Sequence, residues 1–207
     1  MTLFEIFFSL VIVLFSIIIH EIAHGSVALA FGDMTAKDSG RLSLNPLKHF
    51  DFFGFILLPL LTYIILGFPI GSAKPVPINP SNFRNRKVGE VSVALAGPFT
   101  NLLIGTIFAL PIRFLSSSSS LSMPFSFVSF FNFLLGIFNL IPIPPLDGSH
   151  ILLIFFPENW IQLKIFLQQF GFIILILLIF YGGGFILNWV AILAQYLFKF
   201  LSGMTFL

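Results

Sequence analysis

The chain has 207 residues, of which 57% are hydrophobic and only 9% are charged, and its mean hydropathy is +1.06. Soluble domains carry about 25% charged residues, so this composition excludes a disordered chain, a nucleic-acid-binding module and an ordinary soluble enzyme, and it indicates an integral membrane protein. The absence of cysteine also excludes disulfides, thiolate metal ligands and thiol nucleophiles.

The first apolar stretch, residues 3–31, is long enough to span a bilayer as a helix, which takes about 20 residues. Its start is acidic, at Glu5, and no small-residue cleavage site follows an apolar core, so we expect a permanent span rather than a cleaved signal peptide. Further apolar stretches follow at residues 52–68, 91–115, 125–141, 161–181 and 185–201.

Near the end of the first stretch, residues 20–24 read HEIAH, a match to H-E-x-x-H. On a helix His20 and His24 project from one face and can share a zinc ion, which lowers the pKa of a bound water to about 7. Glu21 is then the expected general acid/base. The alternative is a structural role, but a charged residue at mid-membrane costs about 2.5–3.5 kcal/mol, so we favour metal chemistry.

Two basic loops, 32–51 and 72–90, flank the stretch 52–68, whereas the serine-rich connection 116–124 carries no charge. The positive-inside rule puts both basic loops on the cytoplasmic side. A simple span at 52–68, which has Pro59 at its centre, would separate them. We therefore expect 52–68 to be a re-entrant segment or a surface helix.

The two basic loops also contain alternating segments, AKDSGRLSLN at 36–45 and AKPVPIN at 73–79. These patterns predict short edge strands near the membrane surface, to which an extended substrate could pair by strand addition. His49, in the first loop, is expected to be an ordinary solvated residue.

The segment 139–150, NLIPIPPLDGSH, supplies the candidate for a third metal ligand. Catalytic zinc generally has three protein ligands, and the prolines at 142, 144 and 145 interrupt any helix there. Gly148 permits a sharp turn directly after Asp147. Asp147 is our choice for the ligand, with a helix-capping role as the alternative and His150 in reserve.

The last two apolar stretches, 161–181 and 185–201, are joined by three consecutive glycines at 182–184. We expect a C-terminal helical hairpin at about 161–203. With a catalytic core at about 3–156, it would form one membrane-embedded domain, 1–207.

With these two motifs the chain resembles the site-2 protease family of intramembrane zinc metalloproteases, in the short form without a PDZ domain. HEIAH in an apolar helix and the downstream NLIPIPPLDG carry the resemblance. It implies that His20, His24 and Asp147 bind one Zn²⁺ and that Glu21 is the catalytic acid/base.

Two asparagines extend the resemblance. Asn139 matches the family's Asn before the proline and L-D-G run, which implies contact with the substrate or the reaction intermediate; a hydrogen bond to a neighbouring helix is the alternative. AGPFTN at 96–101 is similar to the A-G-P-x-x-N signature, which makes Asn101 a weaker catalytic candidate. Helix packing explains Asn101 equally well, because an interhelical hydrogen bond stabilises a bundle by about 0.6 kcal/mol.

These observations predict an all-α polytopic membrane protein with about five transmembrane helices, one re-entrant or surface helix and short β-strands in the cytoplasmic-side loops. The expected activity is hydrolysis of peptide bonds within transmembrane segments, in a bacterial cell membrane, with the site nearer the cytoplasm. The expected partners are a transmembrane protein substrate and the lipid bilayer, with no nucleic acid, and no substrate-binding residue is assigned. The alternative is a non-catalytic or transport-type membrane metal-binding protein.

Overall fold

The computed structural model describes residues 3–52, 54, 57, 60, 64, 74–115, 119–182 and 184–206, and these contain helices but no strand. The α-helices are α1 (Leu3–Ala30), α2 (Thr35–Asp38), α4 (Arg86–Ile112), α5 (Ser122–Asn139), α6 (Asp147–Phe155), α7 (Ile161–Tyr181) and α8 (Phe185–Ser202). Short 3₁₀ turns are η1 (Pro46–Lys48), η3 (Pro80–Asn82) and η4 (Glu158–Trp160). Five of the described helices, α1, α4, α5, α7 and α8, are long and apolar enough to cross a membrane, which confirms the predicted helical class and number of spans.

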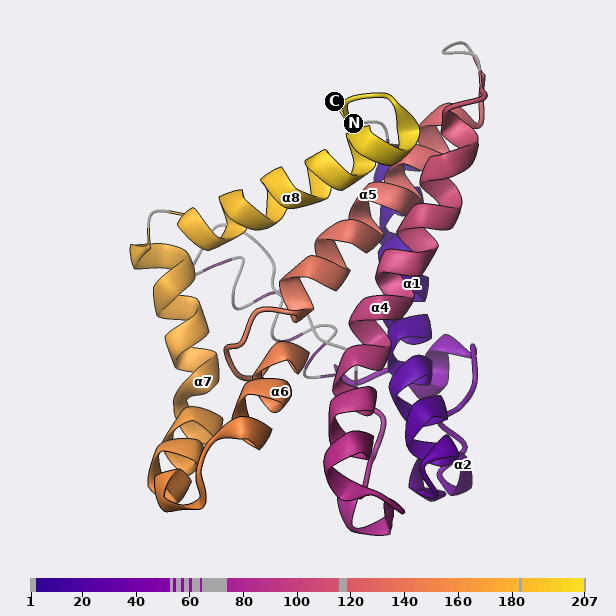
Figure 1. The fold of residues 1–207 in the computed structure, drawn as a ribbon. Helices are drawn as coiled ribbons and strands as arrows, with labels where there is room; N and C mark the ends of the chain where they lie inside the picture. Colours follow the sequence, from indigo (N-terminus) through magenta and orange to yellow (C-terminus); the bar gives the residue numbers. More distant parts are fainter. Residues whose placement is uncertain are drawn as a thin grey trace.

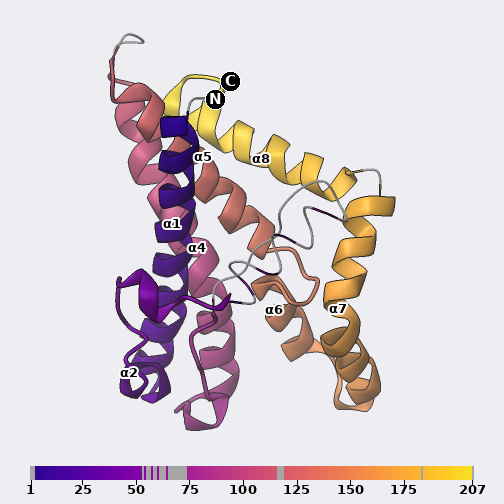
Figure 2. The ribbon, with the colours of Figure 1, turned by 180° about the vertical axis from the view of Figure 1, so that it is seen from behind.

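Helices α1, α4 and α5 lie side by side and form the main bundle (Figures 1 and 2). Helix α4 is central, since it also packs against α6 and α8. Its Ala109 and Ile112 are fully buried against Phe133 of α5 and Phe198 of α8. Small residues on α4 allow this close approach: a Cβ on Gly105 would lie 2.6 Å from Cε1 of Phe133.

Helix α7 stands apart from α1 and α4, and α8 returns from its end across the bundle (Figure 1). The turn between α7 and α8 uses Gly184 in the left-handed conformation, with φ +71°, which glycine adopts without steric cost. Gly171 of α7 packs against the proline-rich segment that precedes α6, where an added Cβ would lie 2.4 Å from Cβ of Pro144. Helix α7 therefore contacts the backbone three residues before Asp147.

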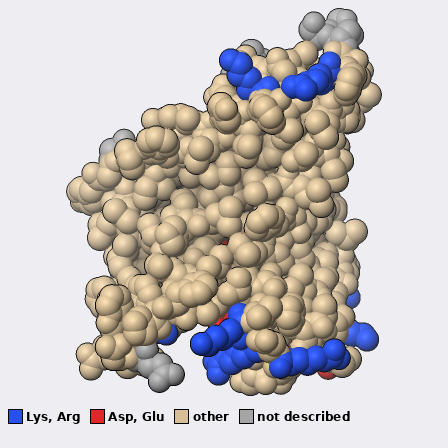
Figure 3. Space-filling view, in the orientation of Figure 1, with Lys and Arg blue, Asp and Glu red and all other residues tan. Residues whose placement is uncertain are grey.

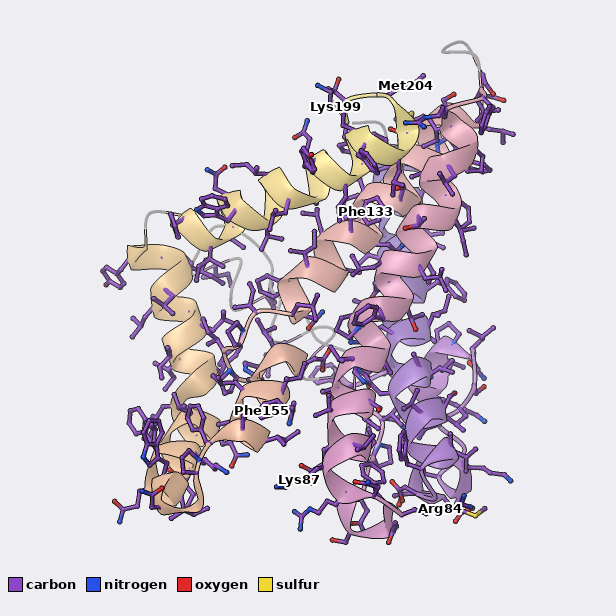
Figure 4. The ribbon with its side chains drawn as sticks, in the orientation of Figure 1. Arg84, Lys87, Phe133, Phe155, Lys199 and Met204 are labelled. Atoms are coloured by element: carbon purple, nitrogen blue, oxygen red, sulfur yellow. The ribbon has the colours of Figure 1, made fainter. Side chains whose placement is uncertain are left out.

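Lysine and arginine side chains gather at two ends of the molecule, with a nearly uncharged band between them (Figure 3). Arg84 and Lys87 lie at one end and Lys199 at the opposite end (Figure 4). This is the distribution expected of a protein whose middle lies in the lipid core.

The prediction of short strands at 36–45 and 73–79 is wrong for the described residues of both segments. In the first, Asp33 accepts hydrogen bonds from the backbone and hydroxyl of Thr35, and the helical turn of α2 begins there. In the second, prolines at 75 and 77 have no N–H. The N–H groups of Val76 and Asn79 donate hydrogen bonds to the carboxylates of Glu21 and Asp33, respectively, instead of to a neighbouring strand.

The prediction that His49 is a solvated loop residue is also wrong, because its side chain is fully buried and Nε2 lies 2.8 Å from the carbonyl oxygen of Ser43. Arg41 donates to the carbonyl of Lys48, and the N–H of Lys74 donates to the carbonyl of His49, so the two loops pack together at this position. The predicted re-entrant or surface segment at 52–68 falls mostly outside the described residues.

Candidate metal centre

His20 and His24 lie one turn apart on α1, on the face that packs against α4. Both side chains are buried, and their Nε2 atoms are 3.0 Å apart. On the far side of each ring, Nδ1 has an oxygen partner at 2.6 Å: the Oδ1 of Asn101 for His20, and the backbone carbonyl of Val93 for His24. Helix α4 thus orients both imidazoles so that their Nε2 atoms converge.

Asp147 reaches the same point from the start of α6. Its Oδ2 lies 3.0 Å from Nε2 of His20 and 3.3 Å from Nε2 of His24. The turn that delivers it requires glycine at 148, since a Cβ there would lie 2.2 Å from the carbonyl oxygen of Leu140. Two segments more than 120 residues apart in sequence thereby place three metal-ligand atoms in one small triangle.

The donor set fits zinc. Ligand atoms at about 2.0–2.2 Å from a tetrahedral zinc would be about 3.3–3.6 Å apart, close to the three observed separations of 3.0, 3.0 and 3.3 Å. The carbonyl of Val93 can only accept, so Nδ1 of His24 carries the hydrogen and Nε2 keeps its lone pair. Oδ2 of Asp147 is buried with no hydrogen-bond partner among the described residues. Converging acceptors without a donor are what a cation would satisfy.

Gly97 of α4 forms the floor of the centre. A Cβ at this position would lie 2.4 Å from Nε2 of His24 and 2.5 Å from Nε2 of His20, closer than real Cβ contacts. Only glycine lets the helix approach the two ligand atoms this closely. Gly97 belongs to the AGPFTN segment, but its role was not assigned from the sequence.

Glu21 follows His20 on α1 and is half-buried. Its Oε2 accepts a hydrogen bond of 2.8 Å from the backbone N–H of Val76. The preceding carbonyl, of Pro75, accepts from Nη2 of Arg41 over 3.1 Å, and the same guanidinium donates to the carbonyls of Lys74 and Lys48. Arg41 is buried, and no pattern in the sequence indicated this role beyond its place in a basic loop.

The remaining predicted site residues are not at the triangle. Asn101 is fully buried behind His20, on the side away from Nε2. Asn139 ends α5 and donates through Nδ2 to the carbonyl of Leu135 in its own helix, over 2.9 Å. His150 is exposed on α6 and is not part of the ligand group.

Comparison with known proteins gives similarity to one kind of enzyme. The model of "Peptidase family M50" matches residues 111–180, a range that includes Asp147. The chain is 38% identical to "Putative zinc metalloprotease YwhC" of Bacillus subtilis, over 79% of this chain and 75% of that protein. It is 32% identical to "Putative zinc metalloprotease Rip2" of Mycolicibacterium smegmatis, over 65% of this chain and 52% of that protein. It is 26% identical to "Zinc metalloprotease MJ0392" of Methanocaldococcus jannaschii, over 72% and 34%. No solved structure matches the chain at a significant level.

Proposed function

Because the chain belongs to peptidase family M50 and is a zinc metalloprotease, we propose that it hydrolyses peptide bonds within the transmembrane segments of other membrane proteins. The observation that carries this proposal is the depth of the ligand group. His24 lies six residues and His20 ten residues before Ala30, where the apolar span Phe7–Ala30 ends. At 1.5 Å per residue these are about 9 and 15 Å. Peptide bonds that reach this depth belong to segments inside the bilayer.

The proposed roles follow from the contacts of each side chain. His20, His24 and Asp147 would hold one zinc ion, which when bound would supply a Lewis acid that activates water and polarises the peptide carbonyl. Oε2 of Glu21 is held by the N–H of Val76, which leaves Oε1 to take a proton from the attacking water. The water oxygen bonds to the carbonyl carbon, the C–N bond breaks, and Glu21 passes the proton to the leaving nitrogen.

Asn139 remains our candidate for contact with the substrate or the reaction oxyanion. Its amide nitrogen has two hydrogens, and Leu135 takes one of them. The other hydrogen can donate to an oxyanion, a contact that stabilises such transition states by about 3–4 kcal/mol. For Asn101 the bond to Nδ1 of His20 favours a positioning role over contact with substrate.

We further propose that the centre lies nearer the cytoplasmic face of a bacterial cell membrane. The end of α1 that carries HEIAH lies at the same end of the molecule as the two basic loops. The second of these loops holds Arg84 and Lys87, whereas Lys199 lies at the opposite end of the molecule (Figure 4). Basic loops stay on the cytoplasmic side of bacterial membranes. The similarity to the Bacillus subtilis protein supports the bacterial assignment.

The alternative, a transport-type metal-binding protein, is supported less well. A transporter needs ionisable or metal-ligating residues along a path across the membrane. Within the part of the chain that the structure describes, His and carboxylate side chains converge in one group, at one depth.

The proposal is tested by Glu21→Gln in purified protein with a single-span membrane protein as substrate. We expect zinc content equal to wild type and loss of cleavage. Glu90→Gln is the matched control, because Glu90 pairs with Arg86 near the start of α4, and it should cleave normally. Full cleavage by Glu21→Gln would refute the mechanism.

A further inference from the structure

A chain of buried side-chain amides connects His20 to α5. Oδ1 of Asn101 lies 2.6 Å from Nδ1 of His20, and Nδ2 of Asn101 donates to Oδ1 of Asn132 over 2.7 Å. Nδ2 of Asn132 donates in turn to the hydroxyl of Ser16 over 2.9 Å and to the carbonyl of Val128 over 2.8 Å. Both asparagines are fully buried. The chain thus joins α1, α4 and α5, the three helices of the main bundle.

Two backbone carbonyls fix the direction of the hydrogen bonds that link Asn132, Asn101 and His20. A carbonyl oxygen only accepts, so the carbonyl of Val128 requires the NH₂ group of Asn132 on its side. Oδ1 of Asn132 then faces Asn101 and must receive its N–H. The carbonyl of Ser16, 3.3 Å from Nδ2 of Asn101, imposes the same orientation independently.

The consequence reaches the metal centre. With its NH₂ group turned toward Asn132, Asn101 presents only an acceptor to His20. Nδ1 of His20 must therefore carry the hydrogen, which leaves the lone pair on Nε2, the atom that faces His24 and Asp147. The carbonyl of Val93 does the same for His24 directly.

We propose that Asn132 is a positioning residue for the zinc centre, acting through Asn101 to fix the tautomer and ring orientation of His20. The inference rests on the assignment of His20 as a zinc ligand. A partner that fixes the second ring nitrogen of a ligating histidine raises metal affinity, and its removal typically costs 10–100-fold. No sequence motif marked Asn132, which lies in the middle of an apolar stretch.

Simple helix packing is the competing explanation, and the molecule supplies its own example. Ser129, three residues before Asn132 on α5, is equally buried and donates to the carbonyl of Gly105 on α4 over 2.8 Å. That bond joins α5 to α4, as the bond between Asn132 and Asn101 does, but it has no connection to His20. Ser129→Ala therefore measures what the loss of one buried interhelical bond does by itself.

The test is the zinc affinity of the purified full-length protein, measured against a competing chelator, for Asn132→Leu and Ser129→Ala. We expect Asn132→Leu to weaken zinc binding by about 10–100-fold. It should also change the visible absorption of Co²⁺ bound in place of zinc, which reports coordination geometry. Ser129→Ala should lower the melting temperature of the metal-free protein and leave zinc affinity and the Co²⁺ spectrum unchanged. Equal zinc affinities of the two variants would overturn the proposal.

Two further variants keep the outcome unambiguous. If Asn132→Leu does not fold, Ser16→Ala removes one of the two acceptors that hold Asn132 and should weaken zinc binding in the same direction but less. Zinc affinity of Ser16→Ala equal to that of Ser129→Ala would then overturn the proposal. His20→Ala, measured alongside, should abolish tight binding. Wild-type affinity of His20→Ala would refute the ligand assignment itself, separately from the role of Asn132.

Discussion

The backbone N–H of Val76 donates to Oε2 of Glu21 over 2.8 Å, although the two residues lie 55 positions apart. The same peptide group accepts, through the carbonyl of Pro75, from the guanidinium of Arg41. One peptide bond therefore links a buried cation to the proposed catalytic carboxylate. Hydrogen bonds in such a chain polarise and strengthen one another, so Glu21 is held in place before a substrate arrives.

Arg41→Gln should lower the rate of catalysis without removing zinc. The guanidinium holds the carbonyls of Lys48, Lys74 and Pro75, and without it the segment that holds Glu21 loses its anchor. A displacement of about 1 Å at a catalytic group can cost up to about 100-fold. We expect kcat to fall by about 10–100-fold, with KM and zinc content close to wild type, measured by steady-state cleavage and metal analysis.

Arg113→Gln is the matched control for this prediction. Arg113 also donates to a backbone carbonyl, that of Phe200, but it lies at the C-terminal end of α4. Its loss should leave kcat unchanged. A fall in zinc content of Arg41→Gln, or equal kcat values for the two variants, would contradict the positioning of Glu21 by Arg41.

Gly97→Ala should destroy the metal centre while the protein remains folded. The new Cβ would lie about 2.4–2.5 Å from both Nε2 atoms, so at least one imidazole must move. We expect zinc affinity to fall at least about tenfold, as smaller changes around metal ligands already do. Competition with a chelator measures this loss.

Gly105→Ala on the same helix is the control for the Gly97 variant. Its Cβ would meet the ring of Phe133 at 2.6 Å, away from the ligands. Overpacking of this kind costs about 1–3 kcal/mol, so the melting temperature should fall while zinc affinity stays. Normal zinc binding by Gly97→Ala would show that the floor of the centre is wrongly assigned.

Asp33, just after α1, should make stability depend on pH. Burial raises the pKa of its carboxyl, but hydrogen bonds from the backbone of Asn79 and the side chains of Thr35 and Asn82 outweigh burial and leave the pKa below its ordinary value of 3.8. A carboxyl with a lowered pKa stabilises the fold above its unfolded pKa, and this contribution is lost as the pH falls through the folded pKa.

We therefore expect the melting temperature to fall as the pH drops below about 4, and Asp33→Asn to remove part of that slope. Asp38→Asn, at an exposed carboxylate of α2, should keep the wild-type slope. Melting curves between about pH 3 and pH 6 measure both. Identical slopes for wild type and Asp33→Asn would show that these hydrogen bonds do not favour the ionised carboxylate.

The features of this molecule that the sequence predicted correctly are those that depend on residues close together in the chain. The i,i+4 spacing of His20 and His24 is sufficient to place two imidazoles on one helix face. Apolar length identified six candidate stretches, because a bilayer of fixed thickness demands it, and the basic loops on both sides of 52–68 reduced the expected spans to five. Asp147 followed from the need for a third ligand and from prolines that leave the backbone there non-helical.

The parts that the sequence did not predict depend on partners distant in the chain. The segment around Val76 has the alternation of a strand, but its N–H groups bind carboxylates of α1 and of the loop after it. His49 was expected to be a solvated loop residue and Arg41 was assigned no role, yet both are buried because the two basic loops fold together. Asn132 has no recognisable spacing, since its role is defined only by Asn101 on a neighbouring helix.

The depth of the cleaved bond tests the central claim most directly. Wild type and Glu21→Gln are reconstituted in liposomes with a single-span substrate, and the ends of the products are mapped by mass spectrometry. We predict that wild type produces new ends inside the apolar segment of the substrate and that Glu21→Gln produces none. Cleavage only outside that segment, or the same internal ends with Glu21→Gln, would contradict an intramembrane zinc protease that uses Glu21.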